Sequence, residues 1–269
     1  YDDYINCLHP FTESDDAPIF MLDNSFACIS VEELWDVLYM KITPGYFKKY
    51  KECVRKVFTE IDPKYDLPEE KWQFASLYGK HSRYSEDLKI GLLYSLVKLV
   101  ELGETDSSKG FSVNSDNECK MLVKQIFDEI KTKDEWLTIC HYIDCFVEAA
   151  PEIVLNEIQK QVADDNSNFW CLFKKRESFL FPTSYCVNIF FALEKMLWIE
   201  QYCARIINVL VMINEKKIEY ATSNTPIDTL YKYFCLFYNQ GALTIEGKQT
   251  LFEKIIKDYP YTGKQLVEV

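Results

Sequence analysis

Apolar residues along most of this chain recur every three or four positions, which is the spacing of one face of an α-helix. The pattern is clearest between Asp134 and Glu215, where DEWLTICHYIDCFVEAAPEIVLNEIQKQV is followed, after a polar break, by SYCVNIFFALEKMLWIEQYCARIINVLVMINE. One such stripe consists of Cys203, Ile206, Ile207, Leu210 and Val211. The stripes are too wide for one neighbouring helix to cover, so we expect stacked pairs of helices.

Capping residues and prolines mark the ends of the predicted helices. Ser30 and Glu33 form a capping-box pattern, and Thr43-Pro44 places a proline at the first position of the next helix, which extends to Ile61. Pro151 allows two helices to follow each other almost without a loop. Further helices are predicted near 68–78, 85–103, 123–130, 136–148, 151–163, 184–197, 200–214, 226–237 and 251–259. The 85–103 helix is apolar on two faces and is expected to be buried in the interior.

The same pattern sets the fold class. No alternating run of five or more residues indicates a strand, and eight glycines with nine prolines are few for the tight turns of a sandwich or barrel. We therefore predict an all-α fold, an α-solenoid-like array of about ten antiparallel helices built from degenerate helical pairs. Residues 1–29 are expected to form an irregular acidic leading segment before a single array at 30–269. The polar stretch at 104–117 is expected to be a mobile loop, and an alternative division places two subdomains on either side of it.

The charge of the chain is acidic and unevenly placed. The net charge is −12, and the first 40 residues contain nine acids and no lysine or arginine. No overall basic footprint for nucleic acid is present, so a nucleic-acid partner is not expected unless a local basic patch exists. The acidity itself is typical of a solvated surface.

The cysteines indicate the compartment. Ten are present, and most lie within apolar helical stripes, as Cys203 and Cys235 do, where reduced cysteine behaves as a small hydrophobic residue. No signal peptide and no apolar run of membrane-spanning length is present. We expect a reduced, cytoplasmic protein. Because the chain begins with Tyr1, we also expect it to be part of a longer polypeptide.

Candidate chemical groups are few. The chain contains no phosphate-binding G-x-x-x-x-G-K-[ST] motif. Cys140, His141 and Cys145 suggest a metal, but Cys140 points about 100° away from the face shared by the other two, and two ligands do not close a zinc site. Three histidines without a nucleophile motif leave no recognisable catalytic triad. The tryptophans, among them Trp136 and Trp198, are expected to be core residues. No catalytic residue, metal site or cofactor is predicted.

Three segments resemble a known family when taken together. They are EEKWQFASLYGKHSRYSEDLKIGLLYSLVKLVELG at 69–103, DEWLTICHYIDCFVEAAPEIVLNEI at 134–158, and FALEKMLWIEQYCARIINVLVMINE at 191–215, which is followed by NTPIDTLYKYF. They resemble the helical carboxy-terminal region of large bacterial proteins, some of which carry a STAND-type nucleotide-binding module used in antiphage defence. The resemblance implies a sensor or scaffold role for residues 30–269. This chain lacks the glycine-containing turn expected after residue 214, and it has Thr225 where the family pattern has an arginine.

The functional prediction follows from these points. We expect a non-catalytic protein-interaction or sensor module of a larger bacterial protein, and the resemblance implies antiphage defence as one setting. The expected partner is another protein or an adjoining domain, with no membrane partner. Its candidate contact residues are Lys80, His81 and Arg83, which could receive an acidic surface or a phosphate, or could instead balance Glu86 and Asp87. The alternative function is a helical enzyme or nucleotide-binding domain with a site in a groove.

Overall fold

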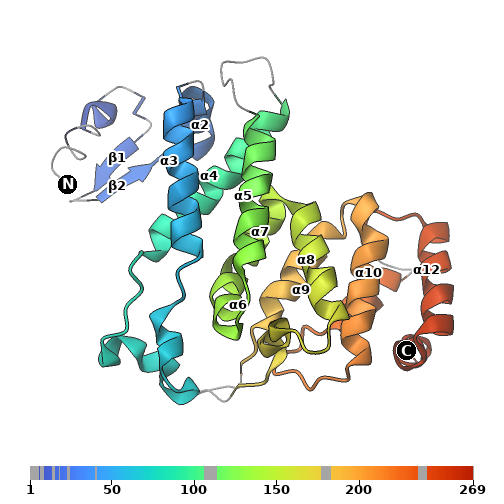
Figure 1. The fold of residues 1–269 in the computed structure, drawn as a ribbon. Helices are drawn as coiled ribbons and strands as arrows, with labels where there is room; N and C mark the ends of the chain where they lie inside the picture. The colour runs from blue at the N-terminus through green and yellow to red at the C-terminus, as the bar shows by residue number, and fades with distance from the viewer. Residues whose placement is uncertain are drawn as a thin grey trace.

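The computed structural model describes residues 6, 9–13, 16–17, 19–22, 25–39, 41–105, 114–176, 183–235 and 241–268. Nearly all of the regular structure in these residues is helical, which confirms the predicted all-α class. Figure 1 shows the helices side by side in approximate chain order, with the N-terminus at one end of the row and the C-terminus at the other. Across the described part of the chain, no helix is both long and apolar enough to cross a membrane.

The elements have the following bounds. The strands are β1 (Ile19–Leu22) and β2 (Ser25–Cys28). The α-helices are α2 (Val31–Tyr39), α3 (Pro44–Phe58), α4 (Glu86–Thr105), α5 (Ser115–Glu129), α6 (Lys133–Ile139), α7 (Ile143–Ala149), α8 (Pro151–Ala163), α9 (Cys186–Met196), α10 (Glu200–Glu215), α11 (Pro226–Phe234), α12 (Ile245–Asp258) and α13 (Pro260–Val267). The 3₁₀ helices are η1 (His9–Thr12), η2 (Pro63–Asp66), η3 (Glu69–Tyr78), η4 (Cys140–Tyr142) and η5 (Asn168–Phe173).

The leading segment contains a hairpin that the sequence pattern did not predict. β1 and β2 pair antiparallel, with Ile19 opposite Cys28 and Leu22 opposite Ser25. The expectation of an irregular segment without strands was therefore wrong for these residues. Each strand has four residues, which is too short for the alternation of apolar and polar positions to be recognised.

Several predicted helix boundaries are confirmed, and others are corrected. The Thr43 side chain caps α3 and Pro44 occupies its first turn, but α3 ends at Phe58 rather than Ile61. The predicted 136–148 helix is divided into α6, η4 and α7. Thr132 and Glu135 form a capping box that starts α6 three residues earlier than the pattern indicated.

Both ends of the predicted 104–117 loop are helical, because α4 and α5 extend into it. α4 continues to Thr105 and α5 begins at Ser115, while residues 106–113 lie outside the described residues. The buried Ser115 hydroxyl donates to the Leu99 carbonyl at 2.9 Å and lies 3.3 Å from the Tyr39 hydroxyl. The division into two subdomains stays a prediction, although these contacts bind the two helices closely.

The helix α4 is only partly buried, contrary to the prediction for a helix apolar on two faces. Leu93, Leu96 and Leu99 are buried, but Leu88 and Ile90 are exposed. The exposed pair lies in the first turns of α4. The prediction was wrong because the packing partners of this helix, mainly α5 and α7, cover its later turns on one face.

The two glycines of α4 provide a matched pair of substitutions. A Cβ atom at Gly103 would lie 2.5 Å from the Ser115 hydroxyl oxygen, whereas a Cβ at Gly91 would meet no atom within 4 Å. Gly103→Ala is therefore expected to lower the free energy of unfolding by about 1–3 kcal/mol. Gly91→Ala is expected to raise it by about 1 kcal/mol, because alanine has the higher helix propensity. Urea denaturation of both variants measures the difference, and a Gly103→Ala variant as stable as Gly91→Ala would contradict the close packing of α4 on α5.

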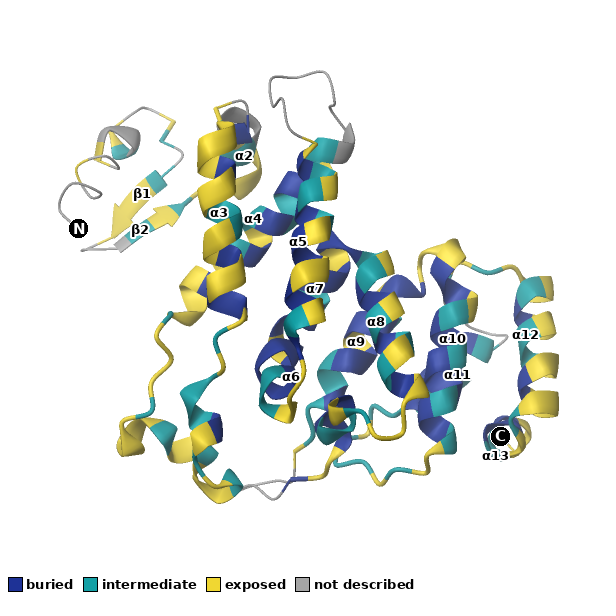
Figure 2. Cartoon of the chain, viewed as in Figure 1, coloured by how far each residue is buried: buried dark blue, intermediate teal, exposed yellow. Residues whose placement is uncertain are grey.

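The hydrophobic core is one cluster that extends from Tyr39 in α2 to Leu266 in α13. The predicted stripe on α10 is confirmed, since Cys203, Ile206, Ile207, Leu210 and Val211 are all buried. Figure 2 shows the buried residues concentrated in the central helices, while the segment between α3 and α4 and the outer side of α12 are largely exposed. Trp136 is buried as predicted, but Trp198 is 64% exposed, so the expectation of a core position was wrong for Trp198. It lies in the short joint between α9 and α10, outside the packed faces of both helices.

Candidate functional site

The segment at 61–85, hereafter the arm, connects α3 to α4 and contains η2 and η3. Figure 1 shows it extending beyond the row of helices on the side of α6. Its two faces differ: one is attached to the helical body by specific polar contacts, and the other faces solvent. Because it protrudes and exposes most of its residues, although Tyr65 belongs to the core, the arm is the candidate functional site.

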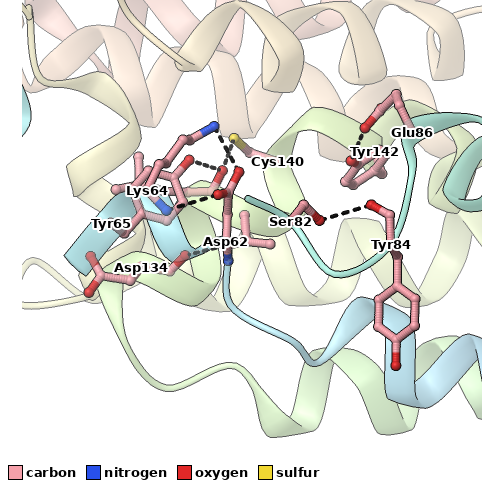
Figure 3. A network of polar contacts seen from close by, with 11 residues as sticks. Asp62, Lys64, Tyr65, Ser82, Tyr84, Glu86, Asp134, Cys140 and Tyr142 are labelled. Carbon is pink, nitrogen blue, oxygen red and sulfur yellow. Dashed lines mark hydrogen bonds and ion pairs between the residues drawn. The ribbon is translucent and has the colours of Figure 1, made fainter. Parts of the chain in front are cut away.

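The first attachment lies at η2. The Asp62 carboxylate accepts a hydrogen bond from the Lys64 backbone at 3.0 Å and so caps η2. The Asp62 backbone amide donates to the Thr138 hydroxyl of α6 at 3.1 Å. The Tyr65 hydroxyl donates to the Leu137 carbonyl at 3.0 Å, and the Tyr65 ring is buried. Figure 3 shows Asp62, Lys64 and Tyr65 gathered beside Cys140. The start of the arm is therefore fixed on α6.

The end of the arm is held at the first turn of α4. The Tyr142 hydroxyl donates to the Glu86 carboxylate at 2.8 Å, as Figure 3 shows. Burial and this hydrogen bond raise the pKa of the Tyr142 phenol. The Lys89 ammonium lies 5.7 Å from the centre of the Tyr142 ring. η4 thus joins the arm's second end to the same part of the body as its first.

A third attachment holds η3. The Glu69 carboxylate contacts the Lys174 ammonium at 3.0 Å and the Arg176 guanidinium at 3.4 Å. The Arg176 guanidinium also lies 5.6 Å from the Trp72 ring centre and 5.0 Å from that of Tyr185. Arg176 is buried, and the Glu69 carboxylate compensates its charge there. Glu69 and Trp72, at the beginning of η3, are the residues through which that helix meets the body.

The rest of η3 exposes apolar side chains. Leu77 is 81% exposed, Tyr78 is 51% exposed and Phe74 is 45% exposed, and η3, which the structure describes in full, contains no buried residue. The backbone leaves helical geometry at Phe74, and Gly79 ends η3 in the left-handed conformation with φ 70°. η3 thus consists of two short 3₁₀ segments that meet at a kink at Phe74, which agrees with the short runs that 3₁₀ helices usually form. This segment keeps a helical form with its apolar side chains in water.

The predicted contact residues lie directly after this apolar surface. The Lys80 ammonium pairs with the Asp66 carboxylate of the same arm at 2.7 Å. The Arg83 guanidinium lies 5.7 Å from the Tyr84 ring centre, and His81 is exposed. Glu86 and Asp87 occupy the first turn of α4, where they already favour the positive end of the helix dipole. The ion pair of Lys80 is therefore with Asp66 of the arm and not with Glu86 or Asp87.

The sequence did not predict that Phe74, Leu77 and Tyr78 belong to the same surface. The residues from Trp72 to Tyr78 predict a short helix, and that prediction does not separate an exposed face from a packed one. The available signal was Gln73-Phe74-Ala75-Ser76-Leu77, in which the apolar positions fit neither a helical nor a strand period well.

The thiols and the imidazole near the arm are uncharged in this environment. Burial raises the pKa of the Cys140 thiol to about 12 and that of the Cys171 thiol to about 11. His141 keeps an exposed edge, yet loss of hydration around its ring and the nearby Lys64 ammonium lower its pKa to about 4. At neutral pH the thiols are therefore protonated and the imidazole is neutral. Within the part of the chain that the structure describes, no group of three or more His, Cys, Asp or Glu residues could hold a metal ion.

Comparison with known proteins gives no guide to function. The chain matches no protein-family model, no curated protein and no solved structure. Its function is therefore inferred from the arrangement of its own residues.

Proposed function

We propose that this chain is a non-catalytic protein-interaction or sensor module, an α-solenoid-like region of a larger bacterial protein, and that the arm is its docking element. The observation that carries the proposal is the exposed apolar surface of η3 on an arm attached to the body at three places. Exposed apolar side chains grouped on a protruding element are typical of protein interfaces. The row of helices in chain order, shown in Figure 1, supports the solenoid-like arrangement.

The charges around η3 indicate the kind of partner. The Lys71 ammonium lies 4.8 Å from the Tyr78 ring centre, and Lys80, His81 and Arg83 follow at the end of η3. A partner with an apolar groove and an acidic rim would cover Leu77 and Tyr78 and meet these basic side chains at the edge. Because three attachments hold the arm in place, a partner would not need to order it on binding.

Photo-crosslinking from two positions tests the proposal. p-Benzoylphenylalanine in place of Leu77 is expected to form a discrete adduct with one protein in the native cells. The same residue in place of Ile245, which is 67% exposed at the start of α12, is expected to form no such adduct. Adding Tyr78→Asp to the Leu77 probe is expected to lower the yield about tenfold or more, because aromatic anchors dominate interface energies.

Two results would count against this function. Identical adduct patterns from positions 77 and 245 would show that the arm is not a docking element. Nucleotide hydrolysis by the purified chain, lost on Lys80→Ala or His81→Ala, would overturn the non-catalytic assignment in favour of the enzyme alternative.

A further inference from the structure

The hairpin of β1 and β2 exposes one of its two faces to solvent. Because side chains alternate along a strand and directly opposed residues lie on the same side, Phe20, Leu22 and Ala27 share this face. Phe20 is 43% exposed, Leu22 is 68% exposed and Ala27 is also exposed. Ile29, which follows β2 directly, is 63% exposed. The hairpin therefore presents apolar side chains where the solvated face of an antiparallel sheet usually carries polar ones.

The opposite face of the hairpin is covered in part by the chain itself. Ile19, Phe26 and Cys28 are half-buried there, and Met21 is exposed. η1 contacts β1, and the His9 ring centre lies 6.2 Å from that of Phe26. A two-stranded hairpin is only marginally stable in water unless it packs against a helix or further strands. The exposed face lacks such a cover among the residues that the structure describes.

The charges around the hairpin are acidic. The first 40 residues contain nine acids and no lysine or arginine. Glu13 and Asp16, before β1, and Glu33, in the first turn of α2 after β2, are exposed and form no ion pair with the described part of the chain. Glu32 instead pairs with Lys98 of α4. An apolar face flanked by unpaired carboxylates is complementary to apolar side chains with basic neighbours.

We propose that the exposed face of the hairpin binds a basic amphipathic helix of a protein partner. Apolar side chains of that helix cover Phe20 and Leu22, and its lysines or arginines meet Glu13, Asp16 and Glu33. Neighbouring strands are about 5 Å apart and an α-helix is about 10 Å across, so one helix is wide enough to cover both strands. Figure 1 shows the hairpin at the N-terminal end of the row, whereas the arm follows the other end of α3. The proposal does not depend on the function proposed for the arm.

The same charges argue against three other occupants of this face. A second copy of the chain that paired hairpin to hairpin would bring two segments without lysine or arginine together, and their carboxylates would repel. The phosphates of a nucleic acid and the headgroups of an anionic membrane are negative as well. A basic amphipathic helix has both the apolar surface and the opposite charge that this face requires.

The test uses the full chain and a defined probe. The probe is a fluorescein-labelled 18-residue helical peptide with leucines on one face and lysines on both flanks, and fluorescence anisotropy measures its Kd. Phe20→Thr and Leu22→Thr together are expected to weaken binding about tenfold or more, because threonine keeps the strand preference but removes most of the apolar contact. Glu13→Gln, Asp16→Asn and Glu33→Gln together are expected to weaken it about fivefold, and added salt is expected to weaken binding to the unaltered chain.

Matched controls distinguish the exposed face from the hairpin as a whole and from the net charge. Met21 is 43% exposed, as Phe20 is, but it lies on the opposite face. Met21→Thr is therefore expected to leave the Kd within about twofold, whereas Phe20→Thr alone is expected to raise it about fivefold. Glu246→Gln, Glu253→Gln and Asp258→Asn together impose the same change of charge on exposed acids of α12, and are expected to leave the Kd within about twofold.

The proposal is overturned if no binding is measured, if Phe20→Thr and Met21→Thr bind the peptide alike, if the two triple variants bind it alike, or if a peptide with glutamine in place of lysine binds equally well. Tighter binding of an oligonucleotide, or of vesicles that contain phosphatidylserine, would also overturn it in favour of those ligands. Self-association of the chain that Phe20→Thr abolishes would overturn it in favour of a second copy.

Discussion

Replacing Trp136 with alanine is expected to lower the free energy of unfolding by about 3–5 kcal/mol, the range for removal of a large buried aromatic side chain. Trp136 is 1% exposed, and its ring centre lies 5.0 Å from that of Phe169 and 6.2 Å from that of Phe127. These two rings come from α5 and η5. Removing the Trp136 ring would therefore leave a cavity between two elements that are distant in the chain.

The loss in free energy of unfolding is expected to be larger than burial of the Trp136 side chain alone would give, because the aromatic rings form a connected series of contacts. Phe127 contacts Phe146 edge to face at 5.6 Å, and Phe146 contacts Phe58 in the same way at 5.4 Å. On the other side, Phe169 lies 5.5 Å from Phe173. Edge-to-face aromatic pairs contribute about 0.5–1.5 kcal/mol each beyond their buried area, and Trp136 is the link between the two halves of the series.

The chain offers a matched control in Trp198. It is 64% exposed, so Trp198→Ala is expected to change the free energy of unfolding by no more than about 0.5 kcal/mol. Guanidinium denaturation followed by circular dichroism measures both variants without relying on tryptophan fluorescence. Trp136→Phe provides an intermediate case if Trp136→Ala does not fold. Equal losses for Trp136→Ala and Trp198→Ala would contradict the aromatic series as the centre of the core.

The contrast between these tryptophans shows how far the sequence predicts this fold. Periodicity identified the helices, and it placed Trp136 and the α10 stripe correctly because those residues lie on helices covered on that side by neighbours. Trp198 has the same residue type and a similar sequence context, but it lies in the joint between two helices. Whether a neighbour covers a position depends on the tertiary arrangement, which the helical period does not encode.

The same reason explains what could be predicted of the candidate site. The basic residues Lys80, His81 and Arg83 were recognisable as a local excess of charge in an acidic region. The apolar surface of η3 was not, because exposed and buried aromatic residues look alike in a sequence. Arg176 was also missed, since nothing in its local sequence indicates that its partners are Glu69 and Trp72, more than a hundred residues earlier.

Arg176→Leu is the second substitution with a large expected effect, a loss of about 2–4 kcal/mol in the free energy of unfolding. Arg176 is 5% exposed, and its guanidinium donates to the Cys171 carbonyl at 2.8 Å and to the Lys174 carbonyl at 3.2 Å. Leucine would leave both carbonyls without this donor and the Glu69 carboxylate without its ion pair to the buried guanidinium. It would also remove the cation that lies between the rings of Trp72 and Tyr185.

Part of this loss is expected to be confined to the arm. Glu69 and Trp72 are the contacts that attach η3, so their release should increase amide hydrogen exchange at 67–80 more than in α10. A released arm must be ordered again when a partner binds, so the photo-crosslinking yield from position 77 should fall in Arg176→Leu although residue 77 itself is unaltered. This links the buried arginine to the proposed function without placing it in the contact surface.

Lys174→Ala distinguishes the contribution of the buried Arg176 from that of any positive charge close to Glu69. Lys174 contacts the same Glu69 carboxylate at 3.0 Å, but its side chain is 63% exposed, so its removal is expected to cost no more than about 1 kcal/mol. Arg176→Lys should recover the charge without the planar fork that reaches both carbonyls, and its stability should lie between those of Arg176→Leu and the unaltered chain. If Lys174→Ala and Arg176→Leu raised hydrogen exchange in the arm equally, the attachment of η3 would depend on surface charge, and the buried guanidinium would not be its anchor.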